Sequence, residues 1–320
     1  MPNIKIIGGG LAGLIAAHHF KNAHVFEAGA RLAKHKALLR FRSDSVANIT
    51  GVPFRKVRVY KEVYYEGQSH QGKCPIALAN RYAKKVTGTI AGRSIMKLDE
   101  CDRFVAPDNL YELLADRLAA EGRLHFHQKI TSDDFRRLEG DVAWINTAPL
   151  PVILNQLGLN QAIPKGEGMA RSSIIVERFK IKTPCDVYQT IYFPDEGKYV
   201  FRASITGNIL IIESVHNPSK KTVNAELQEV CAAFGLNYFS DIDYNSEVVD
   251  QRYGKIVDLP RETREAILYR LTSQHNIFSL GRFATWRNIL LDDVADDLPK
   301  IERLINASAY HREKILKLNG

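Results

Sequence analysis

Residues 4–28, IKIIGGGLAGLIAAHHFKNAHVFEA, carry the pattern from which the fold class can be predicted. Residues 4–7 are an apolar run typical of a short buried strand, and residues 11–20 carry apolar side chains at helical spacing. Residues 24–27 form a second strand-like run that ends in the acidic residue Glu27. The order strand, glycine-rich turn, helix, strand and acid predicts a Rossmann-type βαβ unit that binds an adenine dinucleotide.

Each glycine of the turn has a separate physical task. Gly8 permits the tight turn, Gly10 lets the backbone approach a diphosphate, and Gly13 lets the helix pack against the strand. Glu27 stands close to the expected spacing of about 20 residues for a carboxylate that accepts hydrogen bonds from a ribose. Because a helix N-terminus attracts phosphate, the expected contacts are Gly8, Gly10, Leu11, Ala12, Gly13 and Glu27.

The opening residues resemble those of the glutathione-reductase-type flavoproteins, which include amine oxidases, protoporphyrinogen oxidase and UDP-galactopyranose mutase. The resemblance implies that the cofactor is FAD. Where these families usually have Gly-Gly-Arg, this chain has Gly29-Ala30-Arg31. We expect further cofactor contacts that the resemblance implies or that lie close to the glycine motif in sequence. They are Ala28, Arg31, Arg40, Ile130, Thr147 and Ala148. The last three lie in a strand expected over residues 124–130 and at the end of a buried parallel strand over residues 142–148.

The C-terminal segment, residues 278–294, is similar to the flavin motif of UDP-galactopyranose mutases. In that motif a strand ends in Gly-Arg, an aromatic and a basic residue follow, and a helix then begins beneath the flavin ring. The similarity implies cofactor contacts at Gly281, Arg282, Leu291, Asp292 and Val294. Arg282 would bind the diphosphate, and the start of the helix would stabilise negative charge on the reduced flavin. Trp286 and Arg287 would face the substrate.

The middle of the chain has a different pattern. Between residues 172 and 215, short β-rich runs alternate with glycine-containing turns, which predicts an antiparallel substrate sheet. Tyr192, Tyr199 and Arg202 are its candidates for facing a substrate. The predicted fold class is therefore α/β, with a Rossmann-like FAD-binding domain and a smaller antiparallel β-rich domain. The expected boundaries give residues 1–70, 101–155 and 275–320 to the first domain and residues 71–100 and 156–274 to the second.

The composition of the chain limits its possible partners and its location. The chain has 320 residues and a formal net charge of +8, which favours anionic partners. Its four cysteines are scattered, and no apolar run approaches the about 20 residues of a membrane span, so we expect a cytoplasmic protein without metal or membrane contact. His125 and His127 are interpreted as ordinary strand residues. Much of the basic excess follows the cofactor motif, at Arg31, Lys34, Lys36, Arg40, Arg42, Arg55, Lys56, Arg58 and Lys61.

Three functions are compatible with these patterns. The leading hypothesis is an amine-oxidase-like enzyme in which a C–N bond of an amine or amino-acid-type substrate loses a hydride to flavin N5. A second is a lyase or mutase-like enzyme acting on a nucleotide-linked or DNA-linked base, similar to phage flavoenzymes that build hypermodified thymidines, which would place it in a host cytoplasm. The third is a protein that binds FAD without catalysis. The sequence assigns neither a catalytic base nor an oligomeric state.

Overall fold

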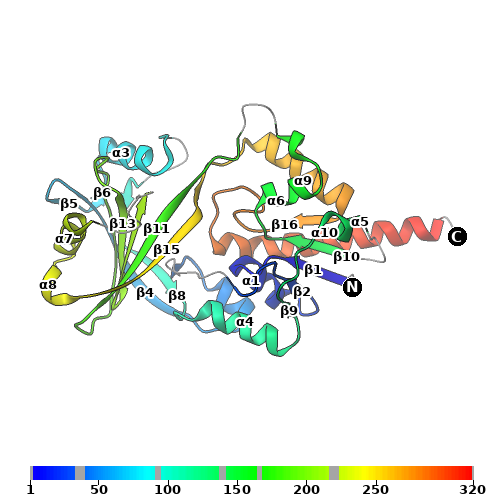
Figure 1. Cartoon of the computed structure of the whole chain (residues 1–320), viewed down its shortest axis with the longest axis horizontal. Coiled ribbons are helices and arrows are strands. Elements are labelled where there is room, and N and C mark those ends of the chain that lie inside the picture. The colour runs from blue at the N-terminus through cyan, green and yellow to red at the C-terminus, as the bar shows by residue number, and fades with distance from the viewer. Residues whose placement is uncertain are drawn as a thin grey trace.

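The computed structural model of the chain describes residues 3–32, 40–90, 95–136, 142–163, 168–215 and 223–318. These residues form two parts that lie side by side, a helix-covered parallel sheet and a large curled sheet (Figure 1). The chain crosses between the two parts several times, so each part is assembled from segments that are distant in sequence.

The first part is built on a five-stranded parallel sheet in the order β16-β10-β1-β2-β9. Two apolar clusters, one on each face, bury its side chains beneath helices. Leu14 and Ile15 of α1 have no exposed surface, and each contributes about 1.5–3 kcal/mol by its burial. The strands are β1 Asn3–Ile7, β2 His24–Phe26, β9 Leu124–His125, β10 Val142–Asn146 and β16 Ile277–Ser279.

Helices cover both faces of this sheet, as in a doubly wound fold. On one face lie α1 Leu11–His19, α2 Ser45–Thr50, α4 Leu110–Ala120 and α10 Leu291–Leu318. On the other lie α5 Ser132–Arg136, α6 Leu150–Gln156, the 3₁₀ turn η1 Asn160–Ala162 and α9 Arg261–His275.

The second part is a nine-stranded sheet in the order β15-β11-β14-β13-β12-β4-β8-β3, with β5 paired to β4. Its neighbouring strands are antiparallel except β4 and β12, which are parallel. The strands are β3 Arg40–Phe41, β4 Arg55–Tyr65, β5 Gln68–His70, β8 Cys101–Val105, β11 Arg171–Ile181, β12 Val187–Tyr192, β13 Val200–Gly207, β14 Ile209–Val215 and β15 Ile242–Ile256. A separate small hairpin pairs β6 Gly72–Lys73 with β7 Lys97–Leu98.

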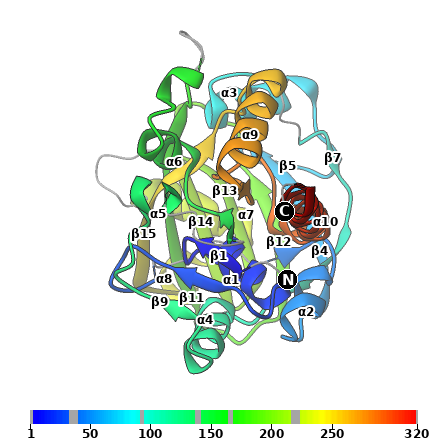
Figure 2. The same cartoon turned by 90° about the vertical axis from the view of Figure 1, so that its right-hand side faces the viewer.

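The two faces of the large sheet have different neighbours. Helix α7, Asn224–Ala233, packs its apolar side chains on the outer face, next to the short α8, Tyr238–Asp241. The opposite, inner face is turned to the Rossmann part and is partly covered at one end by α3, Ile76–Thr87 (Figures 1 and 2). An ion pair of 3.7 Å between Arg178 of β11 and Asp108 ties the inner face to the start of the α4 segment.

The predicted fold class is confirmed: a Rossmann-like part is joined to a β-rich part. One boundary differs from the prediction, because β3, β4 and β8 belong to the large sheet although residues 1–70 and 101–155 were assigned to the first part. The sheet of the second part was expected to be antiparallel but is mixed, because β4 and β12 run parallel. The strand expected over residues 124–130 ends at His125.

Within the part of the chain that is described, no helix has the length and apolar character that a membrane crossing requires. The four cysteines are free thiols, two of them buried.

Candidate functional site

The carboxyl ends of four parallel strands are joined by consecutive backbone hydrogen bonds. Gly8 N donates to Phe26 O at 2.9 Å, Thr147 N to Ile7 O at 2.9 Å, and Leu280 N to Asn146 O at 2.8 Å. In open α/β folds, ligands bind outside this edge of the sheet. The structure thus brings together predicted residues from both ends of the sequence.

The glycines have the geometry that the motif requires. Gly8 has a positive φ of 100°, which a residue with a side chain rarely adopts. A Cβ on Gly13 would lie 2.1 Å from Gly8 O, so the helix could not pack this closely with any other residue there. A Cβ on Gly10, by contrast, would meet no described atom within 4 Å. Gly10 therefore presents open backbone at the start of α1.

Glu27 organises the turn through both carboxylate oxygens. Oε2 accepts from Gly9 N and Oε1 from Gly29 N, each at 2.8 Å. The Gly9 carbonyl accepts from Tyr111 Oη at 2.8 Å. Burial, with the Glu27 carboxylate nearby, raises the pKa of Tyr111, so its hydroxyl stays protonated and remains a donor. Sequence reasoning missed Tyr111, because a tyrosine in α4 carries no local sign of this contact.

The N-terminus of α1 is suited to an anion. No side chain among the described residues caps it, and its first turn contains no acidic residue. The backbone N–H groups at a helix start have no partner within the helix, and the helix dipole makes this end positive. Gly281 approaches the same turn, since a Cβ on Gly281 would lie 3.0 Å from Ala12 Cβ. Leu11, Ala12, Thr147, Ala148 and Gly281 therefore surround one helix start.

The remaining predicted contacts near Glu27 are arranged differently. Ala28 and Arg31 are exposed beside the turn. Ile130 is half-buried and packs on the core beneath α6 and α9, away from the Glu27 loop. The backbone that runs along this loop is instead that of His127 and Gln128, whose N–H groups donate to Gly29 O and Glu27 O. The predicted backbone contact at Ile130 therefore does not lie along the Glu27 loop.

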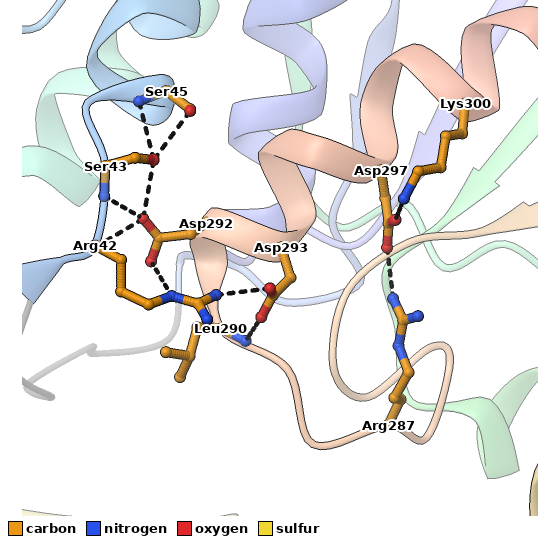
Figure 3. A network of polar contacts seen from close by, with 9 residues as sticks. All are labelled: Arg42, Ser43, Ser45, Arg287, Leu290, Asp292, Asp293, Asp297 and Lys300. Carbon is orange, nitrogen blue, oxygen red and sulfur yellow. Dashed lines mark hydrogen bonds and ion pairs between the residues drawn. The ribbon is translucent and has the colours of Figure 1, made fainter. Parts of the chain in front are cut away.

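The start of α10 is occupied by its own carboxylates (Figure 3). Asp292 Oδ1 accepts from the backbone N–H groups of Arg42 and Ser43 at 2.9 and 3.0 Å. Asp293 accepts from Leu290 N at 2.7 Å and pairs with the Arg42 guanidinium at 2.6 Å. These contacts fix the segment after β3 on the helix start. They give no support to the prediction that Leu291 and Asp292 stabilise a reduced flavin, while Val294 is buried in the adjoining core.

Three predicted substrate residues lie away from the inner face. Arg287 pairs with Asp297 of α10 at 2.6 Å, which fastens the loop after β16 to that helix (Figure 3). Trp286 has no exposed surface and packs in the core beneath α6 and α9. Tyr199 donates its backbone N–H to Glu226 of α7, on the outer side of the sheet.

Arg282, the predicted diphosphate contact, lies beside Phe283, with its guanidinium carbon 5.8 Å from the ring centroid.

The other predicted residues meet on the inner face of the large sheet. Tyr192 and Arg202 are cross-strand neighbours on β12 and β13. Arg40 joins them from β3, with Nη2 2.5 Å from Thr190 Oγ1. The structure therefore places Arg40 with the substrate candidates and not in the dinucleotide turn. Sequence reasoning missed Thr190, Ser204 and Glu213, which complete this polar face, because single polar residues within strands carry no signal of their own.

Four of the basic residues that follow the cofactor motif are paired with acids, among them Arg42 with Asp293 at the start of α10. Arg55 pairs with Asp186 at 2.6 Å, Lys56 with Asp102 at 2.8 Å, and Arg58 with Glu100 at 3.0 Å. Lys34 and Lys36 lie outside the described residues. A basic rim prepared for nucleic acid would leave these charges available for phosphate, so the pairing does not favour one.

The described histidines show no arrangement for metal binding. His125 Nε2 lies 2.9 Å from His24 Nδ1, and the two rings stack. Burial and the neighbouring His125 lower the pKa of His24. In the described ranges, no group of three or more potential ligands is placed to hold an ion.

No family model matches this chain, and no curated protein matches it either. Among solved structures, a reduced UDP-galactopyranose mutase aligns with a TM-score of 0.61 at 17% identity, over 90% of this chain and 89% of that one. A CLA-producing fatty acid isomerase from P. acnes gives 0.60 at 14% identity, over 94% and 97% of the chains. An oxidoreductase from Methanosarcina mazei gives 0.56 at 10% identity, over 94% and 100%. At these identities, the comparisons establish a shared fold over nearly the whole chain.

Proposed function

We propose that this chain binds FAD and oxidises a C–N bond of an amine or amino-acid-type substrate. The observation that carries the proposal is the dinucleotide turn at β1 and α1, with its open Gly10 backbone and uncapped helix start, next to a polar sheet face. The fold shared with the mutase and the oxidoreductase supports it.

The residues present fit the adenine half of such a cofactor. Gly10 and the first turn of α1 offer N–H donors and open space to a diphosphate. Glu27 is held beside them by two backbone amides, with lone pairs left for ribose hydroxyls. When bound, the flavin supplies the acceptor for a hydride.

The protein's own contribution is positioning and exclusion of water. The inner face of the large sheet orients the substrate carbon, which gives up a hydride while its nitrogen gives up a proton. The resulting C=N bond is then open to hydrolysis by water. Because the cofactor supplies the reactive group, this chemistry needs no catalytic triad in the protein.

The test is anaerobic reduction of the reconstituted protein. Candidate amines and amino acids are added in turn, and the visible flavin bands are recorded before and after air is admitted. We expect at least one compound to bleach the bands and oxygen to restore them. If no amine bleaches the protein but a nucleotide-linked or DNA-linked substrate is converted without net redox change, the lyase or mutase hypothesis replaces this one.

A further inference from the structure

Two arginines from distant parts of the chain lie together on the inner face of the large sheet. Arg40 of β3 reaches Thr190 of β12, and the Thr190 hydroxyl lies 3.0 Å from Ser204 Oγ of β13. Arg202 is two residues before Ser204 on the same strand, so its side chain leaves the same face. Burial and the positive charge of Arg202 lower the pKa of Arg40 to about 10.

The cluster has two guanidinium groups, and only one of them is paired with a carboxylate among the described residues. The Arg202 guanidinium pairs with Glu213 of β14, and this carboxylate more than offsets the effect of burial, so the pKa of Arg202 is raised. Arg40 has no such carboxylate within the described part of the chain, and its buried Nη1 finds no hydrogen-bond acceptor there. A buried charge without a counter-charge is costly, since desolvation is not repaid.

One member of the cluster keeps part of its side chain at the surface. The side chain of Arg202 is 29% exposed even though Glu213 beside it is only 8% exposed. The inner face is turned to the part of the chain that carries the dinucleotide turn. Arg178 of this face pairs with Asp108, and the backbone N–H groups that follow β3 donate to Asp292 of α10.

We propose that Arg40 and Arg202 form an oxyanion subsite, which holds a carboxylate or phosphate group of the substrate. The inference rests on the proposed function for the role of the inner face, and it narrows the substrate class. A simple cationic amine is disfavoured beside two guanidinium groups, whereas an amino acid or a nucleotide-linked compound supplies the missing negative charge.

The anion bound by the two arginines could belong to the substrate or to the diphosphate of the cofactor. The following experiment separates these two sources. Binding of inorganic phosphate and of acetate to the FAD-loaded protein is measured by calorimetry at constant ionic strength. Arg40→Gln removes the charge but keeps a donor for Thr190, and Arg40→Lys keeps the charge without the fork. Arg55→Gln is the matched control, because Arg55 is exposed and paired with Asp186.

We expect saturable binding of at least one anion by the wild type and by Arg55→Gln. Arg40→Gln should weaken anion binding about tenfold or more, because this variant loses a charged hydrogen bond. Arg40→Lys should weaken anion binding less, because it keeps the charge. Affinity for FAD should be unchanged in all variants. The anion-free Tm of Arg40→Gln should equal or exceed that of the wild type, because an uncompensated buried charge has been removed.

Four outcomes would overturn the proposal. The first three are no saturable anion binding, equal losses in Arg40→Gln and Arg55→Gln, and a loss of FAD affinity in Arg40→Gln, which would assign the anion to the cofactor. The fourth is a lower Tm of Arg40→Gln with unchanged anion binding, which would make Arg40 a structural residue only. Because these measurements need no turnover, the subsite can be present even if no amine is oxidised.

Discussion

Gly10 and Gly13 differ in what surrounds them, and this difference can be tested with one methyl group. A methyl on Gly13 would lie 2.1 Å from Gly8 O, whereas one on Gly10 meets no described atom within 4 Å. Gly10 also has an ordinary extended backbone, at φ −69° and ψ 170°. We expect Gly13→Ala to lower the free energy of unfolding by about 3 kcal/mol and Gly10→Ala to change it by less than about 1 kcal/mol.

Urea unfolding of the cofactor-free protein measures both values. Gly10→Ala is the matched control, since it adds the same methyl to the same turn. Equal losses in the two variants would mean that the helix does not cross the strand as closely as the structure shows.

The lowered pKa of Lys85 predicts that the free energy of unfolding depends on pH. Its ammonium donates to the carbonyls of Phe193, Asp195 and Val200, and burial lowers the pKa of Lys85 from 10.5 to about 8. Between these two values the unfolded chain binds more protons than the folded chain, so the stability contributed at this site rises with pH. From pH 8 to about 9.5 the wild type should gain about 1.5 kcal/mol relative to Lys85→Met.

The measurement compares unfolding free energies of the wild type and Lys85→Met at these two pH values. Taking the difference removes the titration of other groups. A difference that stays constant would show that Lys85 titrates normally in the folded protein.

The first turn of α10 holds β3 in place through one buried carboxylate. The side chain of Asp292 is 7% exposed and accepts from two backbone N–H groups, whereas that of Asp293 is 33% exposed. Asp292→Ala would leave two backbone donors without their acceptor (Figure 3). We expect Asp292→Ala to cost about 2–4 kcal/mol and Asp293→Ala about 1 kcal/mol in urea unfolding. A larger loss in Asp293→Ala would contradict this account of the helix start.

Elements formed by neighbouring residues could be predicted from the sequence. The unit from β1 to Glu27 lies within one short stretch, so its strand, turn, helix and acid are all visible as local pattern. The partners of β3 and β4 could not be predicted, because pairing with β8 and β12 is decided by residues far along the chain. For the same reason the sequence could not show that Arg40, close in sequence to the cofactor motif, lies on the inner face beside Thr190.

Similarity to a motif also could not tell where each side chain points. Trp286 and Arg287 occupy the positions of aromatic and basic residues in the C-terminal motif, yet one is fully buried and the other pairs with Asp297. Tyr192 and Arg202, both predicted to face a substrate, lie on the same face of the sheet because they are paired cross-strand neighbours. That they contact a substrate stays a prediction.

The charge distribution of the whole molecule predicts weak binding to DNA. The net charge of +8 suggests attraction, but Arg55, Lys56 and Arg58 are engaged by Asp186, Asp102 and Glu100. Fluorescence anisotropy with a labelled duplex should therefore give a dissociation constant weaker than about 1 μM at about 0.15 M salt. Nanomolar affinity with a steep salt dependence would contradict this prediction and favour a DNA-linked substrate.

The proposed function depends on the turn between β1 and α1 holding the diphosphate of FAD. Calorimetric titration of the cofactor-free protein with FAD tests it directly, with Gly10→Val as the comparison. We predict saturable binding of about one FAD per chain by the wild type, yellow protein after removal of free FAD, and loss of both in a folded Gly10→Val variant. A wild type that stays colourless, or a Gly10→Val variant that binds FAD equally well, would contradict the account.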